Sequence, residues 1–375
     1  MPRGYIITKW TEDEGLVAEI SYPEGLEVDL DDMMRVFYAH ITGAGEAGSV
    51  LVRLEKVHSN VFSYFTGMES ETPLMINLML ELGEDPDMFG DAVIQEINDT
   101  ILSYIHQKGT TVSQAYEIVK KLKDYLKNAL FLLERLKNLT KEQRLAQIYS
   151  SEKGRKILKI LQERARSRKE LQAILEVELG KIISNLEITL DPFIKTDLVK
   201  QEWIEGTSDI TLFLLSDFTL LRTPVVKLIE EAKKNRPTSE LAKKYLEEVQ
   251  GFFSIYNPSF VDNIKIAHNM MNPDKYDFIT LFRERAYPLN KIPKGSGSSF
   301  VEISELIKSM EKDHIIKIIK DSKNIEWVFL LTDVSVQTFY PEYLIEKIRS
   351  DRMEGKLKKE IAIKHLELLE KVYTK

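Results

Sequence analysis

The order of hydrophobic patterns over the first 136 residues constrains the fold of this chain more than any other feature. Two β-rich runs, GYIITKW and LVAEISY, flank the turn-like TEDEG and predict a β-hairpin. A helical stripe follows, then three strand-like runs, SVLVRLE, NVFSYFTG and PLMINLML, and then two further helical stripes. The sequence therefore predicts the order β-β-α-β-β-β-α-α, an antiparallel sheet with helices packed against it in an α+β fold.

The helices of this region have recognisable starting signals. Asp29 is placed to cap a first helix over residues 30–42. Asp85-Pro86 predicts the start of a second helix, because proline is favoured at the first helical position. A long apolar stripe then predicts a third helix over residues 112–136.

Gly43, Gly45 and Gly48 have the G-x-G-x-x-G spacing of a dinucleotide-binding loop. In such a site the glycines leave a strand and enter a helix, whose first amides hold the phosphates. Here they leave a predicted helix and enter a predicted strand. We therefore interpret Gly43 as a helix cap and expect no dinucleotide site.

A second region begins at the capping signal Thr140–Gln143. An amphipathic helix is predicted at 154–165, a second helix after the capping box Ser167–Glu170, and a third from residue 179 to about 190. Strand-like runs at 198–205 and 210–217 flank the turn GTSD and predict a hairpin. Three short helices followed by a hairpin are typical of a winged helix.

The remainder of the chain has weaker patterns. Two helices are predicted at 225–235 and 238–255, and residues 259–290 read as irregular or loosely helical. KIPKGSGSS, residues 291–299, has the composition of a flexible linker. The final predicted elements are a helix opened by the capping box Ser299–Glu302, a helix at 312–321, the strand EWVFLLTDV and a terminal helix at 343–373.

Composition and charge narrow the classes of function. The chain has no cysteine, so thiolate metal sites and disulfides are excluded and a reducing cytoplasm is the expected compartment. We expect neither a signal peptide nor a membrane span, because no sufficiently long apolar run occurs. Residues 1–109 contain 20 Asp and Glu against 6 Lys and Arg, an acidic block that would repel phosphate backbones.

Residue patterns that carry enzyme chemistry are missing from the sequence. The six histidines do not fall at metal-ligand spacing, and there is no G-x-S-x-G elbow. Lys294-Gly-Ser-Gly-Ser-Ser lacks the Gly-Lys-Ser/Thr end of a phosphate-binding loop. We therefore predict no catalytic residue, no cofactor site and no metal site, and we expect the protein not to be an enzyme.

The predicted winged helix raises the alternative of DNA binding. A basic cluster at the start of its second helix and polar residues of its third helix would contact DNA in this interpretation. The candidate residues are Arg164, Arg166, Arg168, Lys169, Lys181 and Asn185. Residues 151–222 carry 12 basic and 12 acidic side chains, however, whereas DNA-binding domains usually have a basic face. Protein contact and DNA binding both remain open for this region.

The N-terminal element order, together with the hairpin ITKWTEDEGLVAEISYPE, resembles a longin domain, the roadblock-related scaffold of proteins that bind small GTPases. A longin domain followed by a winged helix is similar to the nitrogen permease regulator-like family, partners of Rag-type GTPases. The resemblance covers residues 4–222 and rests on element order.

The resemblance also carries an expectation about catalysis. One member of that family activates GTP hydrolysis through an arginine just before the fifth strand. The matching stretch here, ESETPLMINLML, has Glu71 and Thr72 and no arginine, while Arg35 and Arg53 lie elsewhere. The resemblance therefore implies a role in binding rather than in GTPase activation.

These observations lead to one predicted architecture and two predicted functions. The predicted domains are a longin-like domain at 1–139 that includes the long helix, a winged helix at 140–223, a helical connector at 224–290 and an α-rich domain at 291–375, the last with the alternative of a degenerate second winged helix. We expect a non-catalytic cytoplasmic adaptor or scaffold that binds a small GTPase or a related complex, with a homodimer left open. The alternative is a winged-helix DNA-binding transcriptional regulator with an N-terminal sensing or dimerisation domain.

Overall fold

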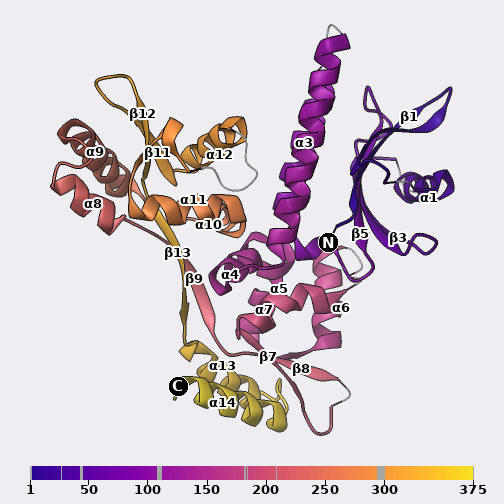
Figure 1. Ribbon diagram of the computed structural model, residues 1–375. Helices are drawn as coiled ribbons and strands as arrows, with labels where there is room; N and C mark the ends of the chain where they lie inside the picture. The colour runs from indigo at the N-terminus through magenta and orange to yellow at the C-terminus, as the bar shows by residue number, and fades with distance from the viewer. Residues whose placement is uncertain are drawn as a thin grey trace. The chain divides into compact units, whose positions relative to one another are not determined.

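The computed structural model of the protein describes residues 2–26, 28–42, 45–107, 112–180, 183, 185–207, 209–293 and 300–374. The chain divides into two compact units, Met1–Asn138 and Leu139–Lys375. Helices and antiparallel sheets occur in both units (Figure 1), so the predicted α+β class is confirmed.

The first unit contains one five-stranded antiparallel sheet with helices on both faces. Its strand order is β2-β1-β5-β4-β3, so β5 lies at the centre. The continuous apolar run of β5 fits this place, because a central strand is buried on both faces. The elements are β1 (Gly4–Thr11), β2 (Gly15–Tyr22), α1 (Leu30–Ile41), β3 (Gly48–Leu54), β4 (Ser59–Phe65), β5 (Leu74–Glu81), the 3-10 turn η1 (Pro86–Met88), α2 (Asp91–His106) and α3 (Val112–Leu136).

The two faces of this sheet are covered by different helices. Met33 and Phe37 of α1 pack against Ile6, Val61 and Phe65 on one face. Figure 1 shows α3 on the other side of the sheet, where the side chains of alternate strand residues point. The sheet thus lies between α1 and the long helix.

One prediction for the first unit needs correction. The helix predicted from Asp85-Pro86 is only the single turn η1, because Gly90 has a φ of 82° and interrupts it before α2 begins at Asp91. The predicted third helix forms as α3, whose apolar stripe is buried from Leu122 to Leu136 but not in its first turns. These turns extend past the strands, and Val112 is 90% exposed.

The glycine-rich stretch connects α1 to β3, which is the order that argued against a dinucleotide site. Asp29 caps α1 as predicted, accepting a hydrogen bond from the Asp31 N–H at 3.4 Å. The predicted cap Gly43 lies outside the described residues.

The second unit contains two three-stranded sheets and a two-stranded ribbon. The strand orders are β6-β8-β7, β10-β12-β11 and β13-β9. The elements are α4 (Lys141–Ser150), α5 (Glu152–Glu163), β6 (Arg166–Ser167), α6 (Arg168–Leu179), α7 (Leu186–Lys195), β7 (Val199–Trp203), β8 (Ile210–Leu214), β9 (Asp217–Thr223), α8 (Val226–Lys233), α9 (Ser239–Ile255), α10 (Phe260–Met271), α11 (Pro273–Glu284), β10 (Tyr287–Pro288), the 3-10 turn η2 (Leu289–Lys291), α12 (Phe300–Lys312), β11 (Ile316–Lys320), β12 (Glu326–Leu330), β13 (Asp333–Phe339), α13 (Glu342–Met353) and α14 (Lys359–Tyr373).

The same element order occurs twice in this unit. The first module runs α5-β6-α6-α7-β7-β8, and the second runs α11-β10-η2-α12-β11-β12. In both modules the last strand of the sequence lies between the other two strands of its sheet. The sequence predicted that the residues of the second module belong to two different domains, a helical connector and an α-rich C-terminal domain.

The ribbon β9–β13 joins parts of the chain that are far apart in sequence. Asp217 pairs with Phe339 and Thr223 pairs with Asp333. After the ribbon the chain returns to the first module, because Leu344 and Ile348 of α13 lie in the same buried cluster as Ile157 of α5. Figure 1 shows α13 and α14 beside β7 and β8 at the end of the ribbon.

The predicted capping boxes mark helix starts correctly, whereas one helix of the first module is displaced from its predicted place. The boxes Thr140–Gln143 and Ser167–Glu170 form as predicted. The third helix was predicted at 179–190 but is α7, because Gly180 ends α6 in a left-handed conformation and Asn185 caps the next helix.

The C-terminal predictions differ most from the structure. Residues 259–290 are mainly two regular helices, α10 and α11, capped by Ser259 and Asn272. The helix predicted at 312–321 includes the strand β11, and EWVFLLTDV contributes to two strands. The terminal helix is interrupted at Gly355, which has a φ of 73°. Of the predicted linker at 291–299, Lys291 belongs to η2, and residues 294–299, with Ser299 of the capping box, lie outside the described residues.

Candidate functional site

Two of the three arginines proposed for DNA contact form ion pairs within the second unit, and the third lies in a strand. The Nε atom of Arg164 lies 3.2 Å from a carboxylate oxygen of Asp351. Arg168 forms an ion pair with Glu187. Arg166 belongs to β6, where it pairs with Leu212 of β8.

The other candidates also have local roles or lie outside the description. The backbone N–H of Lys169 donates to Asp209 at 2.7 Å, while its side chain is exposed. The side chain of Asn185 accepts from the Ile188 N–H at 3.4 Å and so caps α7. Lys181 lies outside the described residues. The six candidates thus do not form a single surface of unpaired cations among the described residues.

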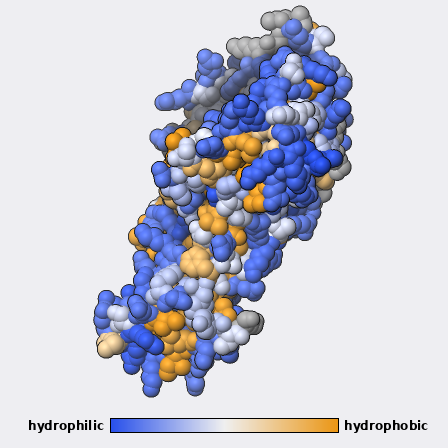
Figure 2. Space-filling view, turned by 90° about the vertical axis from the view of Figure 1, so that its left-hand side faces the viewer, coloured by the Kyte–Doolittle hydropathy of each residue, from blue (hydrophilic) through white to orange (hydrophobic). Residues whose placement is uncertain are grey.

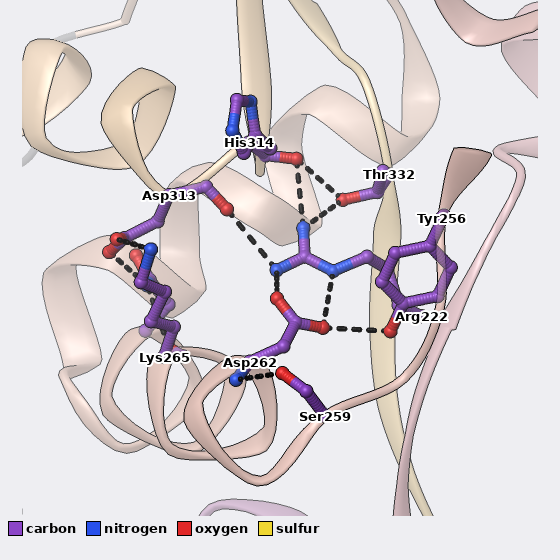
Figure 3. Close-up of polar contacts among 9 residues, drawn as sticks. Arg222, Tyr256, Ser259, Asp262, Lys265, Asp313, His314 and Thr332 are labelled. Carbon is purple, nitrogen blue, oxygen red and sulfur yellow. Dashed lines mark hydrogen bonds and ion pairs between the residues drawn. The ribbon is translucent and has the colours of Figure 1, made fainter. Parts of the chain in front are cut away.

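A buried arginine lies at the centre of the largest polar network of the second unit that we identify (Figure 3). The Arg222 side chain is 0% exposed, and its Nη2 and Nε atoms lie 2.7 and 3.2 Å from the two carboxylate oxygens of Asp262. Nη1 donates to the His314 carbonyl at 2.9 Å and to the Thr332 hydroxyl at 2.8 Å. Nη2 also donates to the Asp313 carbonyl at 3.2 Å.

Aromatic rings enclose the same guanidinium. Its carbon lies 5.7 Å from the Phe252 ring centre and 5.8 Å from that of Tyr256. The Tyr256 hydroxyl donates to Asp262 at 2.7 Å, and burial together with that carboxylate raises the pKa of Tyr256 to about 12. All five donors of Arg222 are used by the protein, so this network is structural and leaves no donor for a ligand.

The first unit presents an incompletely covered sheet surface. We call it the β3–β4 face, and it consists of Ser49, Leu51, Arg53, Asn60, Phe62 and Tyr64. Leu51 lies opposite Phe62 and Ser49 opposite Tyr64 in the strand register. Leu51 is 38% exposed, and both aromatic residues are half-buried. Among the described residues, no strand pairs with the outer edge of β3.

The opposite side of these strands is buried beneath α1. The Nε2 atom of His40 lies 2.9 Å from the Ser63 hydroxyl, between α1 and β4. Burial lowers the pKa of His40 to about 4, because the charged imidazolium would lose its hydration there. One side of β3 and β4 is therefore buried beneath α1, whereas the other side, the β3–β4 face, is partly exposed.

Exposed apolar side chains also occur in the second unit. Ile255, Phe260 and Val261 are exposed at the turn between α9 and α10. Figure 2 shows one face of the molecule, on which apolar side chains gather in patches between hydrophilic stretches. Exposed apolar surface is therefore not peculiar to the first unit. Within that unit β2 and β3 are both edge strands, and the β3–β4 face combines one of these edges with the exposed side chain of Leu51.

Searches for two other kinds of site gave no candidate in the part of the chain that the structure describes. No group of three or more His, Asp or Glu side chains could hold a metal ion. No described helix is long and apolar enough to cross a membrane.

Comparison with protein-family models, with curated proteins and with solved structures found no match to this chain.

Sequence reasoning did not identify the Arg222 network or the β3–β4 face. The partners of Arg222 lie 40 to 110 residues away in the chain, so no local pattern indicates them. The sequence does contain a signal for the β3–β4 face. Alternate residues of both strands lie on the same side of the sheet, and one such set includes Leu51 and Phe62. Alternation predicts two faces, but it does not tell which face a helix will cover.

Proposed function

We propose that this protein is a non-catalytic adaptor that binds a small GTPase, or a complex containing one, through its first unit. The observation that carries the proposal is the topology of that unit. Its element order, β1-β2-α1-β3-β4-β5 followed by α2 and α3, supports the resemblance to a longin domain, which rests on element order. The fold alone does not specify a partner, so the site must be argued separately.

The β3–β4 face supports a binding role. An unpaired strand edge offers backbone donors and acceptors to a partner, and exposed apolar side chains beside it favour protein contact. Leu51 is at the edge and Phe62 lies next to it in the neighbouring strand. We place the contact with the GTPase on this face.

Direct titration tests the proposal. The full chain is titrated by biolayer interferometry with purified small GTPases of the same organism, each loaded with GDP or with a non-hydrolysable GTP analogue. We expect specific binding to at least one of them, with Leu51→Asp weakening it about tenfold or more, because a carboxylate at an interface core must be desolvated.

A matched control is available on the other side of the sheet. Leu30 is 59% exposed at the start of α1, so Leu30→Asp makes the same chemical change away from the β3–β4 face. We expect it to leave GTPase binding unchanged. Binding to no GTPase would overturn the proposed function, and equal losses in both variants would overturn the assignment of the face.

The resemblance further leads us to expect no GTPase activation. Glu71 and Thr72 occupy the stretch before β5 in which the activating family member has its arginine. Addition of the protein should therefore leave the rate of GTP hydrolysis by a bound GTPase unchanged. A large acceleration, measured by phosphate release, would contradict the adaptor role.

A DNA-binding regulator is the second candidate, and the element order of the second unit favours it. The order α5-β6-α6-α7-β7-β8, with β8 between β6 and β7, supports assignment as a winged helix. Arg168 is paired with Glu187, however, and the turn between β7 and β8 includes Glu205 and Asp209 but no cation. We therefore rank this candidate below the adaptor.

Fluorescence anisotropy with mixed-sequence duplex DNA distinguishes the two candidates. The regulator would bind with a steep dependence on salt, and Arg166→Ala with Arg168→Ala would weaken binding and flatten that dependence. No binding at low salt would remove the second candidate.

A further inference from the structure

A groove of about 960 Å³ lies in the second unit between α8, the end of α11, β10 and β12. Leu228 and Phe329 are buried and form its apolar base, while the rings of Tyr287 and Trp327 are half-buried at its sides. The volume is in the range of small-molecule sites. The groove is thus large enough for one ligand and offers it aromatic rings.

Part of the charge along the groove is neutralised within the protein. Lys227 forms an ion pair with Glu284. Arg236 lies 2.9 Å from a carboxylate oxygen of Glu231. These four side chains therefore contribute no net charge to the groove.

Two further cations remain. Arg285 and Lys291 line the groove and are exposed, and neither has a carboxylate within ion-pair distance among the residues that the structure describes. The guanidinium carbon of Arg285 lies 4.7 Å from the centre of the Tyr287 ring. An unpaired cation is thus held directly beside an aromatic ring, and the groove has a net charge that favours an anion.

We propose that this groove binds a nucleotide, with the base stacked on the aromatic side chains and the phosphates held by Arg285 and Lys291. Every base offers a π-face to a ring such as Trp327, and the planar guanidinium of arginine matches phosphate oxygens in pairs. An acidic peptide would satisfy the two cations but would not use the rings. The combination of flat apolar sides and unpaired cations therefore favours a base joined to phosphate.

Isothermal titration of the full chain with ADP tests this inference. We expect a dissociation constant below about 100 µM and a loss of about tenfold for each cation removed in Arg285→Ala and Lys291→Ala. The matched control is Lys233→Ala, which removes the same charge from an exposed position on α8 outside the groove. The control should bind ADP as the unaltered protein does.

Three additional probes identify which part of the ligand is recognised. Adenosine and inorganic phosphate should each bind at least about tenfold more weakly than ADP, because each supplies only one half of the contacts. Short poly-glutamate should also bind more weakly. In a protein carrying Trp10→Phe and Trp203→Phe, ADP should change the fluorescence of Trp327, the remaining tryptophan.

Three results would overturn the inference. The first is the absence of binding at millimolar ADP, and the second is equal ADP binding by Arg285→Ala, Lys291→Ala and the control. The third is binding of adenosine, phosphate or poly-glutamate as tight as that of ADP. None of these measurements includes a GTPase, so their outcome is independent of the proposed function.

Discussion

The side chain of Arg222 has five N–H donors, and all five meet acceptors supplied by Asp262, Asp313, His314 and Thr332. A guanidinium can be buried only when its charge is paired and its donors are used. Nothing in the sequence around Arg222 distinguishes it from an exposed arginine, because its partners lie on elements that only the folded chain brings together. The sequence therefore predicted neither the strand β9 that contains this residue, since the predicted hairpin ended at residue 217, nor the residue's role.

We expect Arg222→Ala to lower the free energy of unfolding of the second unit by about 3–5 kcal/mol, because the partly buried Asp262 would lose its ion-pair partner and the buried guanidinium would leave a cavity. Urea denaturation followed through Trp327 fluorescence measures the change. Arg236→Ala removes an arginine that is 68% exposed and should change stability by no more than about 0.5 kcal/mol. Similar values for both variants would contradict the role assigned to Arg222.

The depressed pKa of His40 makes the first unit sensitive to acid. The pKa of His40 in the folded protein is about 4, below the ordinary histidine value of 6.5. At a pH above 6.5 the neutral imidazole therefore makes its full contribution to stability. That contribution is lost as the pH falls from 6.5 towards 4, by roughly 3 kcal/mol in total. Trp10 stacks on Phe37 with 4.5 Å between ring centres, so its fluorescence reports on this core.

The measurement uses a protein in which Trp203→Phe and Trp327→Phe leave Trp10 as the reporter. Urea denaturation at pH 7 and pH 4 should show a large difference, which His40→Gln should reduce. His106→Gln changes an exposed histidine at the end of α2 and serves as the control. An unchanged pH dependence in His40→Gln would exclude His40 as the cause.

At the scale of helices and strands, local periodicity predicted most of the first unit. The hairpin, α1 and the three following strands occur where alternation and capping signals place them. The predictions are wrong where a single residue, or a strand partner distant in the sequence, determines the secondary structure. Gly90 interrupts a helical pattern. The isoleucines of IKIIK fit the period of a helix as well as that of a strand, and this run forms β11 because it pairs with β12.

The junction between α4 and α5 gives a prediction at this scale. Gly154 lies in the first turn of α5, and a Cβ atom there would be 2.1 Å from the Ile148 carbonyl oxygen of α4. We therefore expect Gly154→Ala to destabilise the second unit by about 1–3 kcal/mol, although alanine is the better helix former. Thermal denaturation followed by circular dichroism measures it.

Gly251 supplies the matched control. It lies in the interior of α9, and a Cβ atom there would meet nothing within 4 Å. Gly251→Ala should therefore raise stability by about 0.5–1 kcal/mol. Opposite signs for the two variants are expected, and stabilisation by Gly154→Ala would contradict the close approach of the two helices.

At the scale of the whole molecule, each unit has a core formed by its own residues, but the second unit is not assembled in sequence order. The buried cluster of its first module includes Leu344, Ile348 and Leu369 from the last two helices. No periodicity could have predicted this return, because it depends on the pairing of β9 with β13. The sequence indicated where helices lie without indicating which of them share a core.

This arrangement predicts how fragments will behave. Residues 139–375 contain the complete cluster and should fold as an isolated fragment, giving a cooperative unfolding transition in circular dichroism. Residues 139–339 lack α13 and α14, so the apolar side chains that these helices cover would be exposed to water. We expect this shorter fragment to aggregate or to lose its cooperative transition, as size-exclusion chromatography and thermal scans would show.

The position of α13 and α14 also determines when the second unit can fold in the cell. A ribosome adds about 5–20 residues per second and delivers the C-terminal end last. The first module of this unit is synthesised early, but its buried cluster stays incomplete until residues 344–369 have left the ribosome. The apolar side chains of α5 and α7 therefore lack part of their cover throughout the synthesis of the second module, and the unit reaches its final form only after α13 and α14 have been synthesised.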